Sequence, residues 1–175
     1  LISRFSIRLD ERDVNPTTFL VEQFQQVLHE FRISLDDLLE KKLLYYLARF
    51  FLGYDKIDPL MRDSHIEDVS CDGAKVSIFI HHRDYGSLES NVVFESEDQL
   101  TQFVVKLAQK CGKHISVSNP MLDATMPDGS RIQMTLSGEV TTKGSTFTIR
   151  RFRSDPITPV DLIEYNTLSP EILSY

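Results

Sequence analysis

The chain has 175 residues, of which 41% are hydrophobic and 26% charged, and its formal net charge is −7. These values are typical of a soluble globular protein with one or two small domains, and the acidic balance argues against a nucleic-acid partner. No apolar run reaches the roughly 20 residues that span a bilayer. The opening residues mix charged and apolar side chains, which does not fit a signal peptide.

The two cysteines, Cys71 and Cys111, form no CxxC motif, whereas a structural zinc site needs about four ligands such as thiolates and imidazoles. We therefore expect two reduced thiols in an intracellular protein. His81 and His82 are adjacent, and on a strand neighbouring side chains point to opposite faces. We expect no joint metal binding by this pair and no metal site.

Two amphipathic helices are predicted near the start of the chain. Asn15 and Pro16 give the first one a side-chain cap and a proline in its first position. Ser34 and Asp37 form a weaker version of a capping box for the second, which ends at Gly53. The second helix has a broad apolar stripe. This stripe either packs in the core of a helical hairpin or faces a partner subunit or a membrane-platform protein.

Period-two alternation replaces the helical pattern after residue 59. Strands are expected over residues 66–69, 76–81 and 87–94, followed by a helix that begins at the cap Ser96 and closes at Gly112. A short extended segment, residues 115–117, comes next. Because short turns join neighbouring strands, the sheet should be largely antiparallel. The predicted class is α+β, with a helical N-terminal region followed by a largely antiparallel sheet that helices cover.

Residues 122–153 contain a tight turn, two alternating strands and a group of arginines. Met126-Pro127-Asp128-Gly129 has turn chemistry, with proline at the first corner and glycine where a left-handed conformation follows. Residues 131–136 and 146–150 alternate between polar and apolar side chains. Pairing them antiparallel with like faces matched sets Ile132 opposite Ile149 and Met134 opposite Phe147.

The same pairing places Arg131 opposite Arg150, and registers slipped by two residues keep the same faces. Like charges directly across a sheet are unfavourable, and arginine stays charged at any working pH. An anion could therefore bind between the two guanidinium groups. Alternatively, the side chains could extend into solvent or meet carboxylates from elsewhere in this acidic chain.

Pro156 and Pro159 interrupt regular structure after residue 154, which predicts a linker. A short helix capped by Thr158 should follow, and Ser169 with Pro170 should begin another. The sequence starts at Leu1 and stops within the last helix, so we expect it to be part of a longer protein.

Four segments in this order, residues 66–73, 122–132, 144–152 and 158–162, resemble the N-terminal half of the secretion ATPase superfamily. This superfamily includes type II secretion system protein E, type IV pilus motors and type IV secretion hexamers. The resemblance is nearest to the archaeal branch, which includes the archaellum motor. It covers the chain from about residue 60 to the end and is carried mainly by the PDGSRI and TFTIRRF segments.

The resemblance implies three regions: a helical region (1–56), the antiparallel-sheet domain (57–153), and a linker with the start of a RecA-like P-loop domain (154–175). It implies a homo-hexamer in the cytoplasm, bound at the inner face of the cell membrane to a platform protein. ATP and Mg²⁺ would be held mainly by the P-loop domain. Arg131 and Arg150 would act in catalysis, and both would contact ATP together with Arg151 and Arg153.

The sequence departs from the family in one respect. It contains no G-x-x-x-x-G-K-[ST] motif and no acidic magnesium-binding segment, so we expect the P-loop shortly beyond Tyr175 and no ATP hydrolysis by this chain alone. Two other functions stay open. The helices over residues 16–52 could dock onto a membrane platform, and the helix-covered sheet could be a small-ligand sensor.

Overall fold

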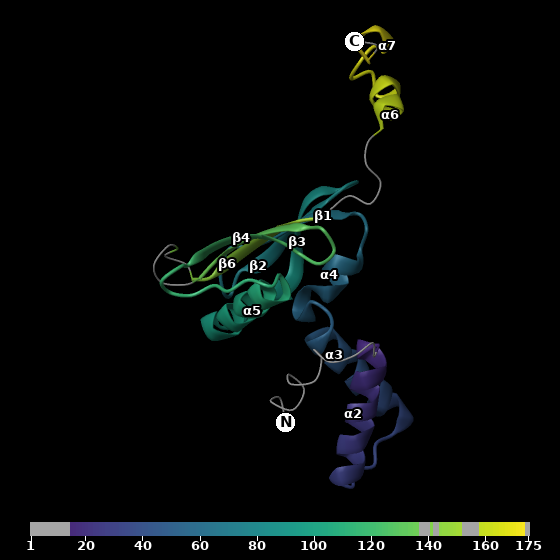
Figure 1. Cartoon of the computed structure of the whole chain (residues 1–175), viewed down its shortest axis with the longest axis vertical. Coiled ribbons are helices and arrows are strands. Elements are labelled where there is room, and N and C mark those ends of the chain that lie inside the picture. Colours follow the sequence, from purple (N-terminus) through teal and green to yellow (C-terminus); the bar gives the residue numbers. More distant parts are fainter. Residues whose placement is uncertain (1–14, 137–140, 142–143, 152–157, 174–175) are drawn as a thin grey trace. The chain divides into compact units, whose positions relative to one another are not determined.

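The computed structural model describes residues 15–136, 141, 144–151 and 158–173. The chain divides between Ser64 and His65 into two compact units, of which the first is helical and the second contains the sheet (Figure 1). No helix in these described residues is both long and apolar enough to cross a membrane.

The helical unit contains α2 (Pro16–Glu30), α3 (Asp37–Phe51), a 3₁₀ turn η1 (Asp55–Ile57) and α4 (Asp58–Arg62). The predicted cap of α2 is confirmed, because the Asn15 side chain accepts a hydrogen bond from the Thr17 N–H at 3.0 Å. The capping box predicted at Ser34 is wrong, since Asp36 occupies the N-cap position of α3. Local hydrogen-bonding potential did not distinguish between the neighbouring residues Ser34, Asp36 and Asp37.

A buried carboxylate closes the turn after α3. Asp58 accepts a hydrogen bond from the Tyr54 N–H at 3.0 Å, and its other oxygen pairs with the Arg62 guanidinium at 2.6 Å. A Cβ atom at Gly53 would collide with this carboxylate. Glycine is therefore required at position 53 by close packing.

The sheet unit has six strands in the order β3-β2-β1-β6-β5-β4, and every neighbouring pair is antiparallel. This confirms the predicted α+β class. The strands are β1 (Ile66–Cys71), β2 (Ser77–His82), β3 (Gly86–Val93), β4 (Met121–Thr125), β5 (Arg131–Thr135) and β6 (Thr146–Arg150).

Two details of the strand prediction need correction. Residues 122–153 contribute three strands rather than two, because β4 pairs with β5 across the turn at residues 126–129. That turn is as predicted, with the Gly129 N–H donating to the Met126 carbonyl at 2.9 Å and Gly129 at φ 86°. The segment 115–117 is not a strand; Ser116 forms only an isolated bridge with Asn119.

Helix α5 (Glu97–Lys110) lies across one face of the sheet (Figure 1). Ser96 caps it as predicted, accepting from the Gln99 N–H at 3.3 Å. Burial of apolar side chains between α5 and the sheet is the main stabilising term of this unit. The rings of Phe94, Phe103 and Phe147 pack together there with centroids 5.0–6.2 Å apart.

Two short helices, α6 (Pro159–Glu164) and α7 (Pro170–Leu173), follow. Thr158 caps α6 through a capping box with Asp161, as its sequence predicted. The predicted linker over residues 154–157 lies outside the described residues.

Both cysteines are free thiols, as the sequence predicted. Burial raises the pKa of the Cys71 thiol and, with Asp128 nearby, that of Cys111. A raised pKa keeps both thiols protonated at neutral pH, which lowers their reactivity.

Candidate functional site

The candidate site lies on the polar face of the sheet, opposite the face that packs against α5. The predicted register of β5 and β6 is confirmed: Arg131 stands opposite Arg150, Ile132 opposite Ile149 and Met134 opposite Phe147. Both isoleucines are fully buried, which holds the strands in this register because a one-residue slip would expose them. The two arginines therefore share the exposed face.

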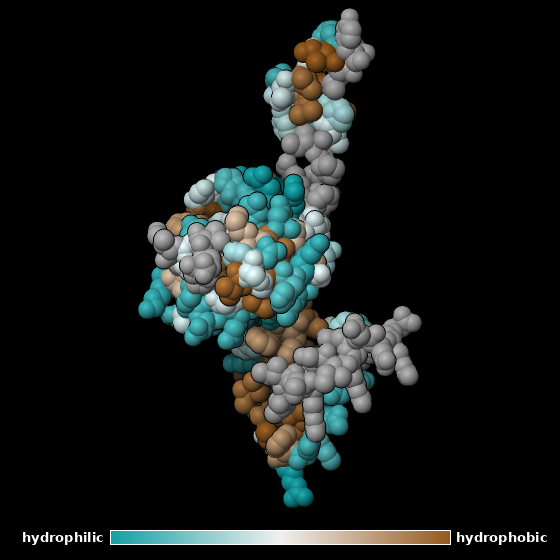
Figure 2. Space-filling model, turned by 60° about the vertical axis from the view of Figure 1, so that its left-hand side comes forward, coloured by the Kyte–Doolittle hydropathy of each residue, from teal (hydrophilic) through white to brown (hydrophobic). Residues whose placement is uncertain are grey.

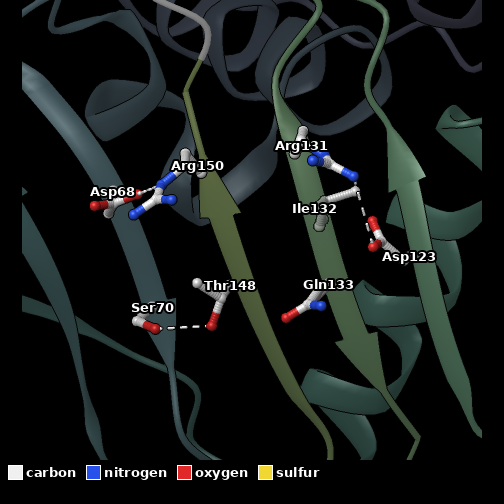
Figure 3. A pocket seen from close by; sticks show the side chains of 8 residues that line it. All are labelled: Asp68, Ser70, Asp123, Arg131, Ile132, Gln133, Thr148 and Arg150. Carbon is white, nitrogen blue, oxygen red and sulfur yellow. Dashed lines mark hydrogen bonds and ion pairs between the residues drawn. The ribbon is translucent and has the colours of Figure 1, made fainter.

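Each arginine has an aspartate beside it (Figure 3). Asp68 on β1 accepts a hydrogen bond from Arg150 Nε at 3.3 Å. Asp123 on β4 lies 4.0 Å from Arg131 Nη2. Four charges, two of each sign, thus lie across strands β1, β6, β5 and β4. Of the two interpretations left open by the sequence, the meeting with carboxylates is the one that these side chains adopt.

A second row of polar groups runs parallel to these charges. Ser70 Oγ and Thr148 Oγ1 are 2.9 Å apart, and Gln133 pairs across the sheet with Asp123 on one side and Thr148 on the other. Together the two rows line a shallow depression of about 480 Å³, whose wall also includes Ile132 (Figure 3). The depression offers guanidinium, hydroxyl and amide donors to a ligand, which suits an anion with several oxygen atoms.

Arg151 and Arg153 are not among the lining residues. The backbone N–H of Arg151 donates to the Glu67 carbonyl at 2.8 Å, and its Nη1 donates to the Ile66 carbonyl at 3.3 Å. Arg151 therefore ties the end of β6 to β1. Arg153 lies outside the described residues.

Sequence reasoning missed both aspartates of the depression. Asp123 could have been found, because extending the hairpin backwards across the turn at residues 126–129 places it opposite Gln133. Asp68 could not be found this way, since it reaches Arg150 only through the pairing of β1 with β6. Nothing local in the sequence specifies that pairing.

No protein-family model matches the chain, but three curated proteins of Methanocaldococcus jannaschii are similar to it. It is 38% identical to the uncharacterized protein MJ1288 over 122 residues, which are 70% of this chain and 48% of that protein. It is 37% identical to the uncharacterized protein MJ0900 over 134 residues, 77% of this chain and 24% of the relative. The chain thus spans about half the length of the first relative and about a quarter of the second.

One solved structure has a similar fold. It is the VirB11 ATPase from the type IV secretion system of Brucella suis, crystallised in complex with sulphate. The match has a TM-score of 0.52 and 20% identity, and it covers 66% of this chain and 34% of that chain. This chain therefore shares its fold with part of a secretion ATPase.

Proposed function

We propose that this chain is the N-terminal regulatory domain of a hexameric secretion or filament-assembly ATPase. In this proposal, Arg131 and Arg150 provide positive charge to the phosphates of ATP, which a downstream P-loop domain holds together with Mg²⁺. The observation that supports it best is the cross-strand pair of Arg131 and Arg150 on one exposed face. The fold shared with a secretion ATPase crystallised with sulphate supports it further.

The residues fit one side of a phosphate site. ATP bound by the second domain would bring a phosphoryl group whose transfer arginine accelerates by stabilising the charge of the transition state. Arg131 and Arg150 would donate from their planar forks to phosphate oxygens, which they match better than an ammonium group does. The sequence has no phosphate loop of its own, so these side chains would form only half of the site.

The remaining arginines have supporting roles in this proposal. Arg151 fixes the end of β6 through its contacts with two β1 carbonyls, and so determines where Arg150 stands. Arg153 would add positive charge next to the phosphates. Hydrolysis would move the second domain against this one, and a membrane platform protein would receive that motion at the inner face of the cell membrane.

Steady-state ATPase kinetics test the proposal in a protein that carries this chain together with its P-loop domain. Arg150→Ala should lower kcat at least tenfold while changing ATP affinity less, because the arginine acts mainly on the transition state. Arg83→Ala is the matched control: Arg83 also forms a 3.3 Å ion pair, with Glu67, but lies outside the depression. Unchanged turnover in Arg150→Ala, or an equal loss in the control, would contradict the proposal.

A second candidate function is docking by the helical unit. Apolar side chains gather on the surface of this unit (Figure 2), and several on α3 are exposed, namely Leu38, Leu39, Tyr45, Tyr46 and Phe50. Exposed apolar patches often mark interaction sites. This function is compatible with the first, since a motor has to transmit its motion to another component.

A further inference from the structure

A second cluster of polar side chains lies in the sheet unit, apart from the residues that line the arginine depression. His65 directly precedes β1, His82 is the last residue of β2, and Asp84 lies in the turn between β2 and β3. The register brings them together, because Ile66 stands opposite His82 and the Arg83 N–H donates to the His65 carbonyl at 2.8 Å.

The ligand atoms of this cluster converge. Asp84 Oδ2 lies 2.8 Å from His65 Nδ1 and 3.9 Å from His82 Nδ1, and one ligand atom from each residue lies within 4.8 Å of the others. Ligands in a tetrahedral zinc site are about 3.3 Å apart, since zinc bonds to nitrogen and oxygen are about 2.0–2.2 Å long. The two measured distances fall on either side of that value. Small side-chain rotations are therefore enough to enclose an ion.

The two imidazole rings are also oriented for this role. They stack with centroids 5.5 Å apart and planes 25° apart, and the Tyr85 ring packs on His82 at 4.8 Å. The Asp84 N–H donates to His82 Nδ1 at 3.1 Å, so this nitrogen directs a lone pair toward the turn. Metal binding would exchange that hydrogen bond for a coordinate bond.

We propose that His65, His82 and Asp84 form a binding site for a divalent transition-metal ion. Two imidazoles and one carboxylate suit Zn²⁺, Co²⁺, Ni²⁺ or Cu²⁺ rather than Mg²⁺ or Ca²⁺, which prefer oxygen ligands. Three protein ligands leave a coordination position for water or for a ligand from another molecule. His81 takes no part, as expected from its orientation; the partner of His82 is His65, which the strand pairing supplies.

Titration of the complete 175-residue chain, made without a histidine tag, tests the proposal. Co²⁺ should bind at one site with the visible absorption of a tetrahedral or five-coordinate ion, and Zn²⁺ should displace it. His82→Ala and Asp84→Asn should each weaken Zn²⁺ binding at least tenfold in calorimetry. His81→Ala and His114→Ala remove a histidine elsewhere and should leave the affinity unchanged.

Circular dichroism of every variant checks that it is folded, and His65→Gln replaces any variant that is not. Wild-type protein that binds no Zn²⁺ at 100-fold molar excess would overturn the proposal. So would unaltered affinity in the folded His65, His82 or Asp84 variants, or an equal loss in the His81 and His114 controls.

Discussion

Arg150 and Arg131 keep 79% and 76% of their side chains exposed although each has an aspartate beside it. Ion pairs this exposed contribute only about 0.2–1 kcal/mol. A phosphate group that accepts from both arginine forks gains charge-assisted hydrogen bonds that are roughly twice as strong as neutral ones. The carboxylates therefore compete weakly with an anionic ligand and do not block the site.

This comparison predicts the effect of removing one competing charge. Asp68→Asn should raise the affinity of the chain for inorganic pyrophosphate by about two- to fivefold, since a pair worth up to about 1 kcal/mol is no longer broken on binding. NMR chemical-shift titration of the 175-residue chain measures this. Glu67→Gln is the matched control, because it removes the same charge from the neighbouring residue, whose partner is Arg83. Unchanged or lower affinity in Asp68→Asn would show that Arg150 does not contact the anion.

Among the elements, the turn from α3 into η1 depends on one buried side chain. The Asp58 carboxylate is 4% exposed, whereas the side chain of its partner Arg62 is 73% exposed. The hydrogen bond from the Tyr54 N–H is therefore the contact that water cannot easily replace. The exposed end of the ion pair contributes little.

Asp58→Ala should consequently destabilise the helical unit by about 1–3 kcal/mol, the cost of leaving a buried donor without its acceptor. Urea unfolding followed by helical circular dichroism measures the change. Arg62→Ala, which removes only the exposed partner, should cost less than about 1 kcal/mol. Equal losses in the two variants would mean that the ion pair, and not the Tyr54 hydrogen bond, stabilises the turn.

For the whole molecule, the division between Ser64 and His65 separates two units with their own packing. The sheet and α5 bury a contiguous set of apolar side chains, so residues 65–175 should fold without the helical unit. A chain lacking residues 1–64 should give a dispersed amide NMR spectrum and a cooperative thermal transition. Loss of that transition would show that the helices complete the core of the sheet unit, which would weaken the docking function proposed for them.

The sequence by itself determined the local elements, the turn at residues 126–129 and the β5–β6 register. Turn chemistry and side-chain alternation are local properties, and burial of Ile132 and Ile149 leaves Arg131 and Arg150 on the same face. The helix starts at Pro16 and Glu97 followed from their caps for the same reason.

Only the tertiary structure decided the strand order and the neighbours that this order creates. Pairing of β1 with both β2 and β6 brings Asp68 to Arg150 and His65 to His82. Several antiparallel orders would match the same polar and apolar faces, because the alternation of a strand does not identify its partner. The charge balance of the arginine site and the existence of the histidine cluster therefore depend on contacts between residues far apart in the sequence.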